Sequence, residues 1–354
     1  MKVLKKILKV FLIAVIVLAV LLGVLLAWLT AVEYRPEAQE TVDVKTLDGE
    51  AKPLASGDAI EIVAWNMGYA ALGDNADFFM DGGKMVYTAD KERVKENLNA
   101  IVSEVRYLDP DIVLLQEIDL NSDRSYHIDE TAYFDTLGYN NMAFANNFKV
   151  PYAPFPIPPM GSIDSGIATY SDYPASSATR ISLPCPFSWP VRTFNLKRCL
   201  LVTRLPVEDG KELVIVNLHL EAYDDGEGKT AQARMLMDIL NEEAAKGNYV
   251  IAGGDFNQSF SNAANDYTVF PDQWQPSFMD VTSFTDNWEF LMNNEIPTCR
   301  SLYKPLVGNE SELQFYMIDG FILSKNITVD SYDILDLGFV NSDHNPQVLN
   351  ITLN

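Results

Sequence analysis

Apolar runs of strand length alternate with segments of helical periodicity along most of this chain. The apolar runs cover residues 60–65, 111–115, 212–216, 249–252, 317–323 and 347–351. Between them, residues 91–107 and 229–245 carry apolar side chains at the three- and four-residue spacing of an amphipathic helix. No internal repeat is evident, and 354 residues can bury a large core. We therefore expect strands and helices that alternate around such a core, as one large domain or two small ones.

The amino end carries a different kind of segment. Residues 10–29 form an uninterrupted apolar run without a charged side chain. At ~1.5 Å rise per residue, a helix of this length would span roughly 30 Å, about one bilayer core. A cleavable signal peptide is the competing interpretation, but its apolar region is usually only about 7–15 residues long. Because Leu29-Thr30-Ala31 is also a poor cleavage site, we predict an uncleaved membrane anchor.

The anchor sets the expected topology and the division into segments. The four lysines that precede the apolar run place the amino end in the cytoplasm by the positive-inside rule. The chain after Ala31 would then lie outside the cell membrane, as the extracytoplasmic part of a single-pass protein. We expect residues 1–31 to form the anchor, residues 32–57 a polar tether that lifts the domain off the membrane, and residues 58–354 the main domain.

Outside the anchor the chain is strongly acidic. No acidic residue precedes position 31. The rest of the chain therefore contains all 49 acidic residues and 22 basic residues, which gives it a formal net charge of −27. Such a surface repels polyanions and gains little from counterion release, which argues against tight DNA binding. Catalysis on a small or transient phosphoester stays open, because a bound divalent cation inverts the local field.

The basic residues and the cysteines each allow two interpretations. Several basic residues around positions 185–199 form either a phosphate-facing patch or solvated charges at strand edges: Arg180, Arg192, Lys197, Arg198 and Arg204. Three cysteines make neither a disulfide framework nor a paired metal motif. Cys185 and Cys199 flank the same Pro-rich segment and could pair outside the membrane, whereas Cys299 has no evident partner.

A second Pro-rich segment lies at residues 146–160, where five prolines alternate with aromatic residues. One interpretation is an extended surface loop that packs on the domain. The other is a rim that contacts the substrate, because stiff aromatic loops bury area at low cost in entropy.

Polar residues of a few chemical kinds accompany the predicted strands, most of them at the carboxyl ends. They are Asn66, Glu117, His219, Asp255, Asn257, Asp319, Asp343 and His344. Judged singly, each has an ordinary interpretation as a turn former, an edge acid or a core histidine. A buried acid is costly unless it is paired or bound to a metal. Together, therefore, these residues indicate one site.

The donor types of this set suit a hard divalent cation and proton transfer. The oxygen donors favour Mg²⁺ or Mn²⁺ over Zn²⁺, which prefers nitrogen and sulfur; they are Asn66, Glu117, Asp255, Asn257 and Asp343. The chain has three histidines, and two of them, His219 and His344, belong to the set. Imidazoles serve proton transfer and phosphate binding, and a neighbouring acid such as Asp319 would orient His344. The combination indicates phosphoester chemistry.

The order of these motifs resembles the endonuclease/exonuclease/phosphatase superfamily, which includes pancreatic-type deoxyribonuclease, abasic-site endonuclease, neutral sphingomyelinase and inositol-polyphosphate phosphatases. The motifs are Trp65-Asn66, Gln116-Glu117, Asn217-Leu218-His219, Gly254-Asp255-Phe256-Asn257, Ile318-Asp319 and Ser342-Asp343-His344. No motif of the series is missing, and the resemblance covers about residues 58–354. It implies that this segment is a catalytic domain with an α/β fold, a four-layer α-β-β-α sandwich of two mixed sheets with the site at one end.

The resemblance also implies how the site binds its ligands. Glu117 would hold the cation, with Asn66 close by and Asp343 in support of the metal. His219 and Asn257 would bind the phosphoryl group. The number of metal ions, one or two, stays open.

For the proton, the resemblance implies two residues and an orienting acid. Asp255 would position or activate the attacking water, and His344, oriented by Asp319, would be the partner in proton transfer. The general base is left open between Asp255 and His344.

The implied activity is that of an outward-facing, membrane-anchored, magnesium-dependent phosphoesterase, in which water attacks a phosphodiester in line. Nucleic acid is the commonest substrate expectation, and a phospholipid or sphingomyelin-type head group is the alternative. A scaffold of the same fold that binds a partner without catalysis is a third reading. Such scaffolds usually lack one imidazole or the metal acid, and here all are present. No protein partner can be read from the sequence.

Overall fold

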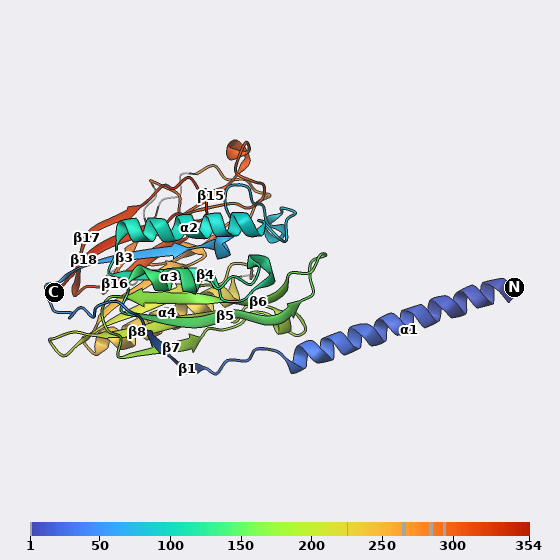
Figure 1. Ribbon diagram of the computed structural model, residues 1–354, viewed down its shortest axis with the longest axis horizontal. Coiled ribbons are helices and arrows are strands. Elements are labelled where there is room, and N and C mark those ends of the chain that lie inside the picture. The colour runs from blue at the N-terminus through green and yellow to red at the C-terminus, as the bar shows by residue number, and fades with distance from the viewer. Residues whose placement is uncertain (1, 225, 264–266, 283–285, 293–294) are drawn as a thin grey trace.

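The computed structural model describes residues 2–224, 226–263, 267–282, 286–292 and 295–354, which form two seven-stranded sheets (Figure 1). The first sheet has the spatial order β1 (Gln39–Val42), β7 (Ser177–Ser182), β8 (Cys199–Pro206), β9 (Glu212–His219), β10 (Tyr249–Asp255), β16 (Asp319–Ser324) and β13 (Trp288–Leu291). The second has the order β17 (Ile327–Ile334), β18 (Gln347–Leu353), β3 (Ala59–Asn66), β4 (Ile112–Asp119), β6 (Gly161–Ser171), β5 (Asn141–Ala153) and β2 (Val44–Thr46).

Shorter elements complete the described part of the chain. The helices are α1 (Lys2–Ala31), α2 (Lys91–Leu108), α3 (Thr131–Phe134) and α4 (Glu227–Ala245). Two small ladders pair β11 (Gln258–Phe260) with β12 (Ser277–Met279) and β14 (Cys299–Arg300) with β15 (Phe315–Tyr316). Single 3₁₀ turns are η1 (Gly68–Ala70), η2 (Phe79–Asp81), η3 (Asp123–Ser125), η4 (Asp135–Leu137), η5 (Val191–Phe194) and η6 (Glu310–Glu312).

The layers follow from the alternation of side chains along the central strands. In β4, Leu114 packs into a core between the two sheets, whereas Val113 packs on the outer side against α2. In β9, Ile215 belongs to the same central core, whereas Val214 packs against α4. Because both faces of these strands are buried, the strands read as nearly continuous apolar runs. This confirms the predicted four-layer α-β-β-α sandwich.

The predicted strands are present but extend further than their apolar runs. β3, β4, β9 and β10 continue through Asn66, Glu117, His219 and Asp255, respectively. Backbone pairing with the neighbouring strands carries the ladder past the last apolar residue. These four polar residues are therefore part of the sheets and do not lie on loops.

The amino-terminal segment differs from the expectation of a free tether. Within residues 32–57, β1 pairs with β7 and β2 pairs with β5, at one edge of each sheet. Residues 32–38 alone separate the end of α1 from β1. The domain therefore sits close to the end of α1.

Within the described ranges, α1 is the one helix long and apolar enough to cross a membrane by length and composition. It projects from the domain as a long helix whose amino end lies far from the sheets (Figure 1). Its carboxyl end contacts η5, and Leu29 there is 1% exposed. The indole nitrogen of Trp189 donates a hydrogen bond to Thr30 Oγ1 at 3.1 Å.

Two further expectations are resolved by the fold. All three cysteines lie in the described part of the chain and are free thiols, so the disulfide between Cys185 and Cys199 is not formed. Cys199 begins β8 and is buried there. The Pro-rich segment is a loop only from residue 154, because residues 146–153 continue β5 as it pairs with β6.

Candidate active site

Strand register brings the polar residues of the first sheet together. The parallel pairing of β9 with β10 sets His219 opposite Asp255. The antiparallel pairing of β10 with β16 sets Asp255 opposite Asp319. In the second sheet, parallel β3 and β4 set Asn66 opposite Gln116. These five strands contribute the residues at the same end of the sandwich, which is where the site lies.

A polar layer beneath the site joins the two sheets. Gln116 Nε2 donates to Asn217 Oδ1 at 2.8 Å, and Asn217 Nδ2 donates to the carbonyl oxygen of Ala168 at 2.8 Å. Gly254 has φ +134°, and a Cβ there would lie 2.2 Å from the Leu218 carbonyl oxygen and 2.9 Å from Gln116 Nε2. Glycine therefore allows the sheets to approach closely enough for residues from both to share one site.

Asp255 lies at the centre of the site. Its Oδ2 accepts a hydrogen bond from Asn66 Nδ2 at 3.0 Å. The same oxygen lies 3.4 Å from His219 Nε2 and 3.8 Å from His344 Nε2. Burial, together with the nearby charge of Asp319, raises the pKa of Asp255 to about 7. The carboxyl group of Asp255, which lies between two imidazoles, therefore titrates close to neutral pH.

His344 is fixed in orientation by a buried acid. Its Nδ1 lies 2.9 Å from Asp319 Oδ2, so Nε2 points toward Asp255. Trp65 Nε1 donates to the carbonyl oxygen of His344 at 2.9 Å. Burial lowers the pKa of His344, but the Asp319 carboxylate and other anionic groups outweigh it and raise that pKa well above its usual range. The imidazole is therefore held protonated and aimed into the site.

His219 differs from His344 in its protonation state. It is buried at the end of β9, and its Nδ1 has no hydrogen-bond partner among the residues that the structure describes. Burial and the positive charge of Arg198 lower the pKa of His219 well below its usual range. Its ring is therefore neutral and able to donate or accept one hydrogen bond to a ligand.

Two site residues adopt left-handed backbone conformations. Glu117 has φ +51° at a β-bulge, where the register between β4 and β6 shifts between Gln116 and Ile118. Asn257 has φ +50°, and its Nδ2 donates to the carbonyl oxygen of Leu220 at 3.0 Å. Non-glycine residues rarely adopt such angles, which concentrate at functional sites. The bulge re-aims Glu117 so that its carboxylate, 25% exposed, faces the pocket.

The carboxylates that could hold a cation are Glu117 and Asp343. Glu117 Oε1 lies 3.4 Å from Asn66 Nδ2. Asp343 is buried, and its Oδ1 lacks a hydrogen-bond partner within the described residues. A buried oxygen without a donor is unfavourable unless a ligand satisfies it. These oxygens therefore fit a hard divalent cation.

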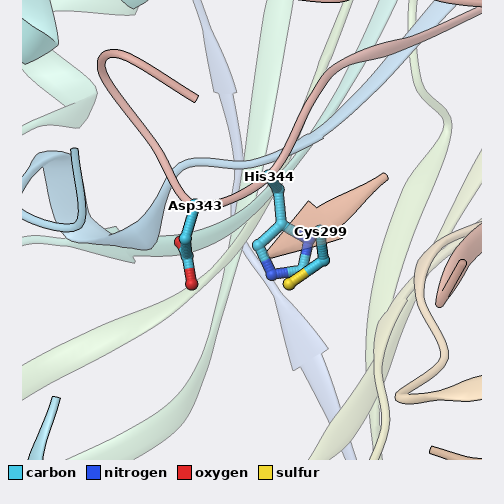
Figure 2. Close-up of side chains that lie close together, drawn as sticks. All are labelled: Cys299, Asp343 and His344. Atoms are coloured by element: carbon cyan, nitrogen blue, oxygen red, sulfur yellow. The ribbon is translucent and has the colours of Figure 1, made fainter. Parts of the chain in front are cut away.

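Figure 2 shows Asp343 and His344 extending from neighbouring positions of one loop, with Cys299 beside the imidazole. One donor atom from each of these three residues lies within 4.8 Å of the others. Burial raises the pKa of the Cys299 thiol to about 12. The thiol therefore stays protonated, and the anionic groups of the site are carboxylates.

These side chains meet at a pocket with a volume of about 540 Å³. Six of the eight predicted residues line it: Glu117, His219, Asp255, Asn257, Asp343 and His344. The other two, Asn66 and Asp319, lie behind this lining and hold Asp255 and His344 by hydrogen bonds. The structure therefore brings all eight residues into one assembly.

Two lining residues, Arg124 and Tyr69, were not predicted from the sequence, and a third, Arg198, was considered there as a member of the basic cluster. Arg124 is buried and ion-paired to Asp119 at 2.9 Å, with its guanidinium 3.6 Å from the Tyr69 ring centroid. Arg198 is 4% exposed, and its Nε and Nη1 atoms make no hydrogen bond to any described group. No local pattern marks Arg124 or Tyr69, because both come from irregular segments after strands.

The five basic residues around positions 185–199 are each ion-paired within the protein, so they are not a set of free solvated charges. Arg204 pairs with Glu243 at 2.6 Å, and Arg192 pairs with Glu33 at 2.9 Å. Of the five basic residues proposed, Arg198 lines the pocket. The cluster is therefore mostly structural, with one member facing the site.

Comparisons with known proteins agree with this geometry. The sequence profile of the Endonuclease/Exonuclease/phosphatase family matches residues 63–301. No curated protein sequence matches the chain at a significant level.

Solved structures share the fold. An endonuclease/exonuclease/phosphatase from Beutenbergia cavernae DSM 12333 has a TM-score of 0.56 and 17% identity, over 84% of this chain and 72% of that one. The human Nocturnin catalytic domain with bound sulfate has a TM-score of 0.52 and 18% identity, over 88% and 97%. ANGEL2, described as a 2′,3′-cyclic phosphatase, has a TM-score of 0.53 and 15% identity, over 88% and 98%.

The profile match covers more than half of the chain and includes five of the eight site residues: Asn66, Glu117, His219, Asp255 and Asn257. The chain therefore belongs to the endonuclease/exonuclease/phosphatase family, whose members are hydrolases that act on phosphoester bonds.

Proposed function

We propose that this chain is a membrane-anchored phosphodiesterase that depends on a divalent cation, Mg²⁺ or Mn²⁺. The observation that carries the proposal is the buried carboxylate of Asp255, which lies between the imidazoles of His219 and His344 at one end of a pocket. A non-catalytic scaffold has no use for such an arrangement, because its buried charges cost stability. ANGEL2 with a bound adenosine-2′,3′-vanadate and Nocturnin with a bound sulfate share the fold, which supports a phosphoryl ligand here.

In the proposed reaction, water attacks phosphorus in line and one ester bond breaks, which yields a phosphomonoester and an alcohol. Asp255 accepts the proton of the water, since it is buried and contacts both imidazoles. His344, held by Asp319, gives a proton to the leaving oxygen. In this division of roles Asp255 is the general base. The sequence had left that role open between Asp255 and His344.

The phosphoryl group is bound by neutral and cationic donors. His219 and Asn257 line the pocket beside Asp255. Arg198 supplies the buried donors Nε and Nη1, which make no hydrogen bond within the described residues, although Nε lies 3.8 Å from Glu221 Oε2. Glu117 and Asp343, with Asn66 close by, hold the cation. When bound, the cation neutralises charge on the phosphoryl oxygens and lowers the pKa of a bound water.

Contacts at the end of α1 support an anchor that is retained. Leu29 is buried there, Thr30 accepts a hydrogen bond from Trp189, and Glu33 pairs with Arg192 at 2.9 Å. Cleavage after Ala31 would remove the first two contacts from the domain. We therefore propose a single-pass protein whose catalytic domain lies outside the cell membrane, as the lysines before the apolar run predict.

The metal requirement tests the proposal directly. Full-length protein in detergent is expected to hydrolyse bis(4-nitrophenyl) phosphate, to lose this activity after dialysis against EDTA, and to regain it with excess Mg²⁺ or Mn²⁺. The measurement is release of 4-nitrophenolate. Undiminished hydrolysis after EDTA treatment would show that the cation has no part in the reaction.

Arg198→Met is expected to lower kcat/KM about 10- to 100-fold, mainly through KM, because the substrate loses charge-assisted hydrogen bonds. Arg198→Lys keeps the charge and should recover part of the loss. Arg106→Met, on the exposed face of α2, is the matched control. An unchanged KM in Arg198→Met, with an unchanged melting temperature, would remove this residue from substrate binding.

A further inference from the structure

The deep part and the mouth of the pocket differ in chemistry. The deep part presents the site carboxylates and imidazoles together with Arg124 and Arg198. The mouth is apolar, with Phe79, Phe155 and Phe194 among its lining residues. Phe79 and Phe155 make an edge-to-face contact with ring centroids 6.2 Å apart. A pocket built this way fits a molecule with a phosphoester at one end and an apolar group at the other.

Exposed apolar side chains surround this mouth. Met80, Phe155 and Val191 line the pocket, and Ile157 and Trp189 belong to the same two loops as Phe155 and Val191. Their exposed fractions lie between 43% and 92%, with Ile157 the most exposed. We call these five residues the apolar rim. Soluble domains rarely gather large apolar side chains on one exposed rim unless it contacts a partner or a membrane.

The apolar rim lies beside the end of the proposed anchor. Trp189 donates its hydrogen bond to Thr30, immediately after the apolar run of α1, and α1 contacts η5, which contains Val191. In Figure 1, α1 leaves the domain at the end toward which the β5–β6 connection extends. That connection carries Phe155 and Ile157. Tryptophan is typical of the bilayer interface, so Trp189 would lie at the level where the hydrocarbon core ends.

The short segment that connects α1 to the domain keeps the apolar rim close to the membrane. Glu33 pairs with Arg192 at 2.9 Å and lies 3.5 Å from Lys197, so the residues after α1 are held against the segment that bears Trp189 and Val191. The net charge of −27 outside the anchor gives no attraction to anionic lipids. Apolar contact, together with the anchor, must therefore hold the rim at the bilayer.

We infer that the apolar rim rests in the outer surface of the bilayer and that the substrate is a phosphodiester with an apolar tail, drawn into the pocket from that membrane. The inference rests on the proposed function and makes the lipid alternative, rather than nucleic acid, the substrate class. The phosphoryl group would reach Asp255 and His344 while the tail stays among the aromatic side chains of the mouth. The acidic surface away from the rim would disfavour a polynucleotide.

Two esters with the same leaving group test the substrate class. Full-length protein in phosphatidylcholine vesicles is assayed with hexadecyl 4-nitrophenyl phosphate and with methyl 4-nitrophenyl phosphate. We expect kcat/KM at least ~100-fold higher for the hexadecyl ester, because its tail is buried in the mouth. Equal values for the two esters would overturn the inference and leave the phosphodiesterase intact. Hydrolysis of neither ester would overturn both, and faster hydrolysis of a diribonucleotide would overturn the inference alone.

A surface variant tests the rim separately from the chemistry. Ile157→Ser is expected to lower hydrolysis of the hexadecyl ester about fivefold and to leave the methyl ester within about twofold. Tyr107→Ser is the matched control, since Tyr107 is 82% exposed in the last turn of α2, at the other end of the domain. An equal effect of Ile157→Ser on the two esters would contradict a membrane role for the rim.

A readout independent of activity uses a fluorescent label. Ile157→Cys and Tyr107→Cys are each labelled with nitrobenzoxadiazole and placed in vesicles that contain 5-doxyl phosphatidylcholine, with the labelled parent chain subtracted as background for Cys185. We expect quenching at position 157 and none at position 107. A label at position 157 that is not quenched, or that is shielded only when the protein forms a dimer, would show that something other than lipid covers the rim.

Discussion

Replacement of His344 by alanine is expected to lower kcat for phosphodiester hydrolysis ~10²- to 10⁴-fold. The variant loses the group that we propose protonates the leaving oxygen, and Asp319, 2.9 Å from its ring in the native chain, loses its partner. The measurement is kcat against pH with saturating Mg²⁺. In the native protein the rate should fall at high pH as His344 loses its proton, and this alkaline limb should be absent in the variant.

The third histidine provides the control. His127 is exposed in a turn beside Asn121 and Asp123, outside the pocket. His127→Ala should keep the native kcat. Because an unpaired Asp319 costs stability in the variant, melting temperatures of both variants must accompany the kinetics. A folded His344→Ala protein with native kcat would refute the proposed proton transfer.

Glu117→Gln is expected to weaken binding of Mn²⁺ and to lower kcat/KM at least ~100-fold at a fixed metal concentration. The substitution keeps the volume of the side chain and removes the charge that we propose holds the cation. Glu117 is well suited to the test because its carboxylate is partly exposed in the pocket and makes no ion pair with Lys or Arg within the described ranges. Structural damage should therefore be small.

Metal binding can be followed without turnover by electron paramagnetic resonance of free Mn²⁺. Glu96→Gln, an exposed carboxylate on α2, is the matched control and should bind Mn²⁺ as the native chain does. A large excess of Mn²⁺ should restore part of the activity of Glu117→Gln. If Glu117→Gln binds Mn²⁺ with native affinity, the cation is held elsewhere.

The sequence was informative where chemistry and periodicity act locally. Helix α2 is capped at its amino end by Asp90, whose side chain accepts a hydrogen bond from the backbone N–H of Arg93, and at its carboxyl end by Asp109 in a left-handed conformation. Both ends lie close to the predicted residues 91–107. The buried central strands were equally readable, because burial on both faces requires apolar residues at successive positions.

Irregular backbone conformations and contacts between distant segments could not be predicted from the sequence. A left-handed φ at Glu117 depends on how β6 pairs with β4 around the bulge, which no neighbouring residue encodes. The pairing of Arg192 with Glu33 joins residues far apart in the chain. The segment expected to be a tether likewise contains two edge strands. Gln39–Val42 pairs with the edge of β7, and Val44–Thr46 pairs with the edge of β5.

By itself, the amino-acid sequence determined which donor groups this protein carries and that they accompany buried strands. It could do so because donor type and hydrophobic pattern are properties of the residues and their immediate neighbours. Tertiary structure alone decided that Asp255 lies between two imidazoles and that the mouth of the pocket opens beside the end of α1. Strand register and the packing of distant segments set these distances, and both arise from contacts between residues widely separated in the chain.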